Sequence, residues 1–189
     1  MEKTNVDEAA VITGQLESRN VVRVDSRERQ ICIRERNYTN TAANLELAFA
    51  GITAGTHDGT LEANDATTVA QANKFDAVSN GFVTSSISDS AANLATLTGT
   101  TGAYTVTLTA GEAAASLAEL VSINAATTGA ITLNALTIAE DYSGSADDLE
   151  SAFVGIADGT HTGTLGATGA TTVAQANKFD AVSTGVVTA

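Results

Sequence analysis

Proline and tryptophan are absent from the 189-residue chain, cysteine occurs once, and aromatic residues make up only 4 % of it. A single cysteine excludes a disulfide within the chain. A core with few aromatic side chains must be built from Ala, Val, Leu and Ile. Each of these stabilises the fold less than an aromatic side chain does, because burial contributes roughly 25 cal/mol per Å² of apolar surface and they bury less surface. This composition favours a thin, regularly stacked structure over a globule around a deep pocket.

Long apolar runs are also missing. No stretch of about 18 apolar residues predicts a membrane-spanning helix, and the first eight residues, Met1–Glu8, lack the basic and then apolar pattern of a secretory signal. We therefore expect no membrane span.

Basic residues are concentrated near the start of the chain. Residues 1–40 hold seven basic and seven acidic residues, whereas residues 41–189 hold two lysines against fifteen acids, which accounts for the whole net charge of −13. Fifteen of the sixteen glycines also follow residue 40. We interpret residues 1–40 as a separate unit. Nucleic acid is not expected as a partner, since the acidic remainder repels phosphate.

The acidic part contains an internal duplication. The stretch ATTVAQANKFDAVS occurs at 66–79 and again at 170–183, an offset of 104 residues. At this offset, 31 of the 45 residues in 41–85 are identical in 145–189. We predict a first repeat unit over 41–140 and a second, partial unit over 141–189.

Helix and strand patterns alternate along these units. Apolar residues at helical spacing predict helices near 45–52, 69–78, 117–121 and 149–156. Alternating runs predict strands near 82–87, 104–109 and 131–133. Residues 104–109 carry threonine on one face, so we expect helices on one side of a parallel sheet. The predicted fold is an α/β repeat array of alternating helices and short parallel strands, β/α solenoid-like, after a small N-terminal β segment; a doubly wound sheet is the alternative. Phe49 and Phe153, at matching positions, should both be buried.

Two β-branched segments in residues 1–40 predict a pair of short strands, Arg19–Asp25 and Arg29–Glu35. A pair of this size is marginal alone, so we expect it to fold against a partner. Its valines and isoleucines would supply apolar contact, and its arginines would bind carboxylates bidentately. A solvated strand pair is the alternative. The candidate anchor residues are Arg19, Val21, Val22, Arg23, Val24, Arg29, Ile31, Ile33 and Arg34.

Residues that could carry chemistry are few, and we predict no catalytic, cofactor-binding or metal-binding site. His57 and His161 occupy the same position in the two copies and are interpreted as structural. Cys32 is expected to be a buried small hydrophobe. The acids of the second part form no EF-hand loop and are assigned to helix starts and loops. They are Asp58, Asp65, Asp89, Asp141, Asp147 and Asp148.

A resemblance adds to this interpretation. The stretches TTVAQANKFDAVSNGFVT at 67–84 and SISDSAANLATLTGTTGAYTVTLTAGEAAASLAEL at 86–120 resemble repeats of large cyanobacterial surface proteins and cyanophage fibres. The pattern at Arg19–Arg34 is similar to segments near the start of tailed-phage capsid-decoration and fibre proteins. The resemblance implies a non-enzymatic structural protein on the virion surface, anchored on other capsid or tail proteins through 1–40, with an acidic array pointing outward. It also implies a homo-oligomer, for which a trimer is one option. A bacterial cell-surface or adhesin protein is the alternative; the missing secretory signal favours the virion.

Overall fold

The computed structural model describes residues 34–100 and 102–189. The chain divides into two units, residues 1–36 and 37–189. Arg34 and Glu35 form a helical turn, where a strand was predicted. The rest of the predicted strand pair, Arg19–Asp25 and Arg29–Glu35, lies outside the described residues. Residues 38–40 of the predicted N-terminal segment form strand β1 of the second unit. All the other described helices and strands belong to the second unit.

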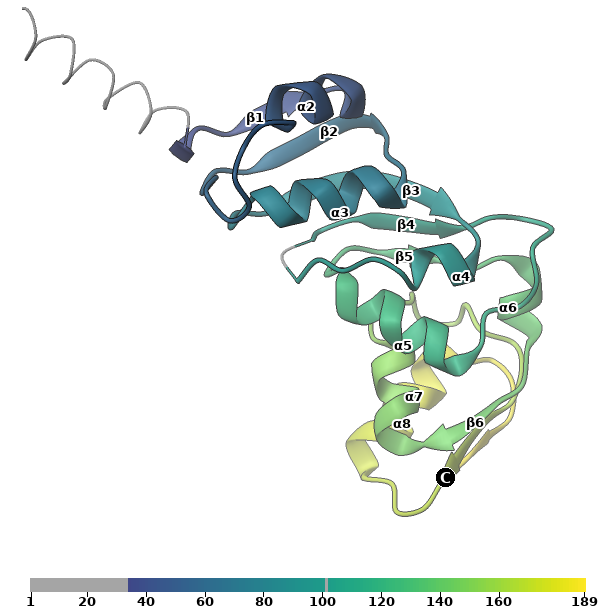
Figure 1. The fold of residues 1–189 in the computed structure, drawn as a ribbon. Coiled ribbons are helices and arrows are strands. Elements are labelled where there is room, and N and C mark those ends of the chain that lie inside the picture. Colours follow the sequence, from purple (N-terminus) through teal and green to yellow (C-terminus); the bar gives the residue numbers. More distant parts are fainter. Residues whose placement is uncertain (1–33, 101) are drawn as a thin grey trace, which may run out of the picture. The chain divides into compact units, whose positions relative to one another are not determined.

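The described strands of the second unit are short and parallel, and within each of two sheets every strand pairs with the next strand in sequence (Figure 1). One sheet has the order β1-β2-β3-β4-β5 and the other the order β6-β7-β8. Their bounds are β1 (Tyr38–Asn40), β2 (Leu61–Ala66), β3 (Val83–Asp89), β4 (Thr105–Leu108), β5 (Ile131–Thr132), β6 (Tyr142–Ser145), β7 (Leu165–Thr168) and β8 (Val187–Thr188).

A helix follows each strand from β1 to β7, so that strand and helix alternate along the unit. In each helix the side chain of the N-cap residue accepts a hydrogen bond from a backbone N–H of the first turn, which would otherwise have no partner. The helices are α2 (Ala42–Phe49), α3 (Val69–Val78), α4 (Ala91–Leu94), α5 (Leu117–Ala126), α6 (Ala135–Ala139), α7 (Ala146–Phe153) and α8 (Val173–Val182).

The strands bury one face only. In β3 the side chains of Val83 and Ile87 are buried, whereas Ser86 and Ser88 on the opposite face are exposed. In β4, Val106 is buried and Thr105 is exposed. The order of the elements and the parallel pairing of the strands confirm the prediction of parallel strands alternating with helices. Helices α2, α3 and α5 lie along the same side of the first sheet in Figure 1.

The two copies of the repeat have the same register. Tyr38 pairs with Leu61 and Leu61 with Val83; in the second copy Tyr142 pairs with Leu165 and Leu165 with Val187. Phe49 and Phe153 are both buried, as predicted.

A third form of the α3–β3 motif occurs between the two copies, at α5 and β5. Helices α3, α5 and α8 each have ten residues, and each begins with a capping box, formed by Thr68 and Gln71, by Ser116 and Glu119, and by Thr172 and Gln175. After each helix a hydroxyl side chain accepts from a glycine N–H two residues on, at 3.0 to 3.1 Å; these pairs are Ser79–Gly81, Thr127–Gly129 and Ser183–Gly185. The alignment of α5 with α8 has an offset of 56 residues, from Ser116 to Thr172.

We call each strand together with the helix that follows it a layer. These glycines lie where the backbone of one layer meets that of the previous layer. A Cβ on Gly81 would lie 2.3 Å from the carbonyl oxygen of Gly59, and one on Gly185 would lie 2.2 Å from that of Gly163. A Cβ on Gly129 would lie 2.1 Å from the carbonyl oxygen of Tyr104. Glycine is therefore required for the close stacking of successive layers.

Candidate interaction surfaces

An aromatic and histidine cluster lies in the core of each repeat copy. In the first copy the ring centroid of Phe49 lies 5.5 Å from that of Tyr38 and 5.0 Å from that of His57. In the second copy the ring of Phe153 lies 5.6 Å from Tyr142 and 5.1 Å from His161. Both histidines are buried. They pack within the core, and neither ring is accessible to a substrate from solvent.

The pKa values of three groups in the second copy, two buried and one exposed, are shifted from their ordinary values. Burial lowers the pKa of His161, against the opposing effects of the Asp141 carboxylate and of the backbone of Thr164 and Thr137. The pKa of Asp141 is lowered because its carboxylate accepts the backbone N–H of Thr164 at 2.6 Å. Burial raises the pKa of Tyr142. These effects favour the neutral imidazole of His161 and the ionised carboxylate of Asp141.

The acidic residues singled out in the sequence hold the backbone and neighbouring side chains in place. Asp65 accepts the N–H of Ala42 at 2.6 Å, and Asp89 accepts that of Ser90 at 2.8 Å. Further acceptors are Asp58 for Asn80, Asp147 for Gln175, and Asp148 for Ser145. Among the described residues no three His, Cys, Asp or Glu side chains are grouped as metal ligands.

A polar hollow of about 410 Å³ lies on the open face of the first sheet. Its lining includes Glu62 and Asp65, together with the hydroxyl-bearing residues Thr84, Ser86 and Thr105. Glu62 accepts the hydroxyl of Thr39 at 2.9 Å, and Asp65 is bonded to the backbone of Ala42. The second copy carries Gly166 and Gly169 at the positions of the two acids, so this hollow is not a property of the repeat.

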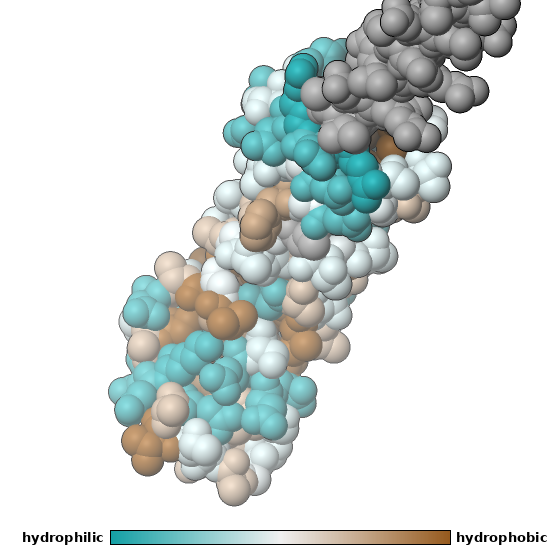
Figure 2. Space-filling model, turned by 90° about the vertical axis from the view of Figure 1, so that its left-hand side faces the viewer, coloured by the Kyte–Doolittle hydropathy of each residue, from teal (hydrophilic) through white to brown (hydrophobic). Residues whose placement is uncertain are grey.

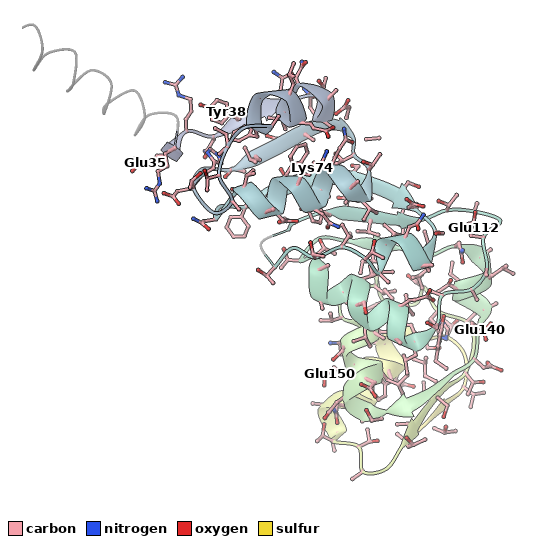
Figure 3. The ribbon with its side chains drawn as sticks, viewed as in Figure 1. Glu35, Tyr38, Lys74, Glu112, Glu140 and Glu150 are labelled. Carbon is pink, nitrogen blue, oxygen red and sulfur yellow. The ribbon has the colours of Figure 1, made fainter. Side chains whose placement is uncertain are left out.

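An apolar groove of about 310 Å³ runs between α2 and α3. Its lining includes Phe49, Ile52 and Phe75, and an ion pair between Lys74 and Glu46 joins the two helices. Figure 3 shows Lys74 on α3. The second copy has the same pair, Lys178 and Glu150, at 3.8 Å. Hydrogen bonds from Lys74 and Gln71 lower the pKa of Glu46, whose side chain is 35 % exposed. Because both side chains of the ion pair reach solvent, the pair contributes little to stability.

The predicted anchor residues lie almost entirely outside the described part of the chain. Of the nine, only Arg34 is described; it is exposed and lies in the helical turn before β1. The other eight lie outside the described residues, so their role as an anchor stays a prediction. Cys32 also lies outside the described residues.

Two faces of the second unit carry apolar side chains that the other copy of the repeat buries. Val173 of α8 is 79 % exposed, whereas Val69, its equivalent in α3, is 8 % exposed. Ile52, after α2, is 38 % exposed, whereas Ile156, after α7, is 6 % exposed. Figure 2 shows apolar patches separated by hydrophilic surface on one side of the molecule, with one at the lower end of the view. These faces could not be predicted from the sequence, because the residues at these positions are identical in the two copies and only the neighbouring residues that cover them differ.

The described helices include none that is both long and apolar enough to cross a bilayer. Comparison of the chain with protein-family models, with curated proteins and with solved structures found no match.

Proposed function

We propose that this chain is a structural protein of a virion, a capsid decoration or fibre protein. Residues 1–40 attach it to other virion proteins, and the following residues form an outward-pointing acidic β/α solenoid-like array. The protein has no catalytic role in this proposal. The like charge of the arrays keeps particles apart and soluble.

The observation that carries the proposal is where the two repeat copies agree and where they differ. The copies share the aromatic and histidine cluster, the capping box of α3 and α8, and the glycine stack. Of the fourteen positions that differ between 41–85 and 145–189, twelve are exposed in the first copy. They include Asp58, Glu62 and Asp65, which become Thr162, Gly166 and Gly169. Duplication has kept the framework and not the polar chemistry of the surface, which supports a structural role.

Fractionation of the producing culture tests the location. Density-gradient separation with detection by mass spectrometry is expected to place the protein in the band that contains DNA-filled particles. Its recovery with the cell envelope, in the absence of particles, would contradict the virion proposal and support a bacterial cell-surface or adhesin protein instead.

The anchor is tested by deletion of residues 1–36, which leaves β1 and the ring of Tyr38 in place, and by fusion of residues 1–40 to an unrelated reporter. The deleted protein should remain folded and lose attachment to the particle, and the fusion should gain it. Attachment that survives the deletion would move the anchor into the repeats.

A further inference from the structure

We propose that copies of this chain bind one another head to tail, through two different faces of residues 37–189. The C-face is formed by Thr171, Val173, Asp180 and Val187, from the segment of α8 and β8. The N-face is formed by Tyr38, Ala48, Gly51 and Ile52, from the segment of β1 and α2. This contact does not depend on the proposed location of the protein on a virion.

The chain already contains the same junction once, inside itself. Helix α5 and strand β5, the third form of the α8–β8 motif, pack against α7 and the residues after it, which are the second form of α2. Asn124 of α5 accepts the N–H of Gly155 at 2.8 Å and donates its amide to the carbonyl of Ala152. The N–H of Ile131 donates to the carbonyl of Gly155 at 3.1 Å, and Ile131 forms a parallel bridge with Ile156.

A tyrosine completes this internal junction. The hydroxyl of Tyr142 donates to the carbonyl of Ala115, just before α5, at 2.6 Å. The side chain of Leu117 also fills the space above Gly144 in β6, where an added Cβ would lie 2.5 Å from it. The α5 side of the junction therefore offers apolar side chains, a carbonyl and an amide, and the α7 side offers a glycine backbone, an isoleucine and a tyrosine hydroxyl.

The two faces of the proposed contact reproduce these groups position by position. With the offset of 56 residues, Ala115, Leu117, Asn124 and Ile131 correspond to Thr171, Val173, Asp180 and Val187. With the offset of 104 residues, Tyr142, Ala152, Gly155 and Ile156 correspond to Tyr38, Ala48, Gly51 and Ile52. Val187 can thus pair with Ile52 of a second copy, and the hydroxyl of Tyr38 can donate to the carbonyl of Thr171.

The N-face is open at the point where the internal junction is closed. A Cβ added to Gly51 would have no heavy atom within 4 Å, whereas one added to Gly155 would lie 2.7 Å from Asn124 Oδ1 and 3.2 Å from the side chain of Ile131. Gly51 has no positive φ. A larger residue at position 51 therefore fits the single chain and collides with the bound copy.

One substitution sets the strength of the contact. Asp180 stands where the internal junction has Asn124. Its carboxylate can accept the N–H of Gly51 but cannot donate to the carbonyl of Ala48. The net charge of −13 also opposes association, and salt screens this repulsion. We expect a weak contact that strengthens with ionic strength. Because the two faces differ, each copy keeps one unoccupied face after it binds a neighbour, and further copies can add one after another.

The experiment is sedimentation velocity of the full chain at increasing concentration up to about 1 mM, under reducing conditions so that Cys32 forms no link. The wild type should form dimers and longer species, more of them at high salt. Asp180→Asn should tighten the association about tenfold, since it restores a hydrogen bond and removes a like charge. Asp158→Asn makes the same charge change at an exposed position outside both faces, and its effect should be much smaller.

Two blocking variants identify the faces. Gly51→Leu should block the N-face and Val173→Lys the C-face, and each protein alone should stay monomeric while circular dichroism and melting temperature match the wild type. The lysine reduces the net negative charge, so added repulsion cannot explain its effect. An equimolar mixture of the two should form dimers through the remaining pair of intact faces. Wild type and Asp180→Asn that stay monomeric throughout, or blocked variants that associate as well as the wild type, would overturn the proposal.

Discussion

Phe153 is the side chain whose truncation should cost most in the second repeat copy. Its ring is 1 % exposed and makes edge-on contacts with Tyr142 and His161. Phe→Ala at a buried site costs about 3–5 kcal/mol in total. Of this, an aromatic pair accounts for about 0.5–1.5 kcal/mol beyond the buried area. Phe153 makes two such contacts, and we expect Phe153→Ala to lower the free energy of unfolding by about 4 kcal/mol.

Urea unfolding of the full chain, followed by circular dichroism, measures this loss. With a slope of about 2 kcal/mol per M, the midpoint should fall by about 2 M. Phe82→Ala is the matched control, because this phenylalanine is 64 % exposed and a surface change usually stays within about 0.5 kcal/mol. If Phe153→Ala cost less than about 1 kcal/mol, or no more than Phe82→Ala, the cluster would not be a support of the fold.

Three further predictions concern the layers and the buried polar groups. Gly81→Ala should lower the melting temperature and reduce the free energy of unfolding by about 1–3 kcal/mol, because its Cβ would meet the carbonyl of Gly59. Gly51→Ala is the control: it has open space around its Cβ and should leave the melting temperature unchanged. Tyr104→Phe removes the hydroxyl that donates to Asp76 and lies 3.4 Å from the carbonyl oxygen of Ala72, and it should cost about 1–3 kcal/mol in urea unfolding. Tyr38→Phe is the control and should cost far less, because among the described residues the Tyr38 hydroxyl has no hydrogen-bond partner. The midpoint of urea unfolding should fall as the pH falls below about 6.5, because burial lowers the pKa of His161 in the folded chain and the unfolded chain therefore binds the proton first. His161→Leu should flatten this pH dependence between about pH 7 and pH 5.5. If the slope were the same in the variant, His161 would not be the group responsible.

Much of the repeat could be predicted from the sequence because its signals are local. Apolar spacing placed α3 and α7, and the alternation of Val106 and Leu108 with threonine placed β4. The shared segment 66–79 and 170–183 predicted two equivalent structures, and the caps and registers of the two copies agree. Parallel pairing followed from the alternation of helix and strand.

The third form of the motif could not be seen in the sequence. Only four of the seventeen residues in 116–132 match 68–84 at the offset of 48. What the two segments share is a cap, a hydroxyl and a glycine at fixed spacing, and many residue combinations meet these requirements. Strand β2 was also missed, because LEANDA has three polar residues and a register shift instead of clean alternation.

The histidines show why a candidate site needs the neighbouring layer as well as the residues. His57 and His161 could be assigned a structural role from their repetition alone, but the sequence does not show that each packs against a phenylalanine and a tyrosine from separate parts of the chain. Those contacts exist because the layers bring positions 38, 49 and 57 together. The anchor interpretation of residues 19–34, by contrast, stays a prediction.

Identical residues in the two copies have different surroundings, and the difference lies in the adjacent layer. Asp76 and Asp180 occupy the same place in the same helix sequence, yet Asp76 accepts the hydroxyl of Tyr104 from the following layer and Asp180 is exposed. Asn124, at the same position in α5, bonds to the layer of α7. In two of the three forms of the motif this position therefore bonds to the layer that follows. An exposed Asp180, on the same helix as an exposed Val173, thus has the properties of an interface residue without its partner layer. Substitution at position 180 is the most direct way to change how tightly such a layer binds.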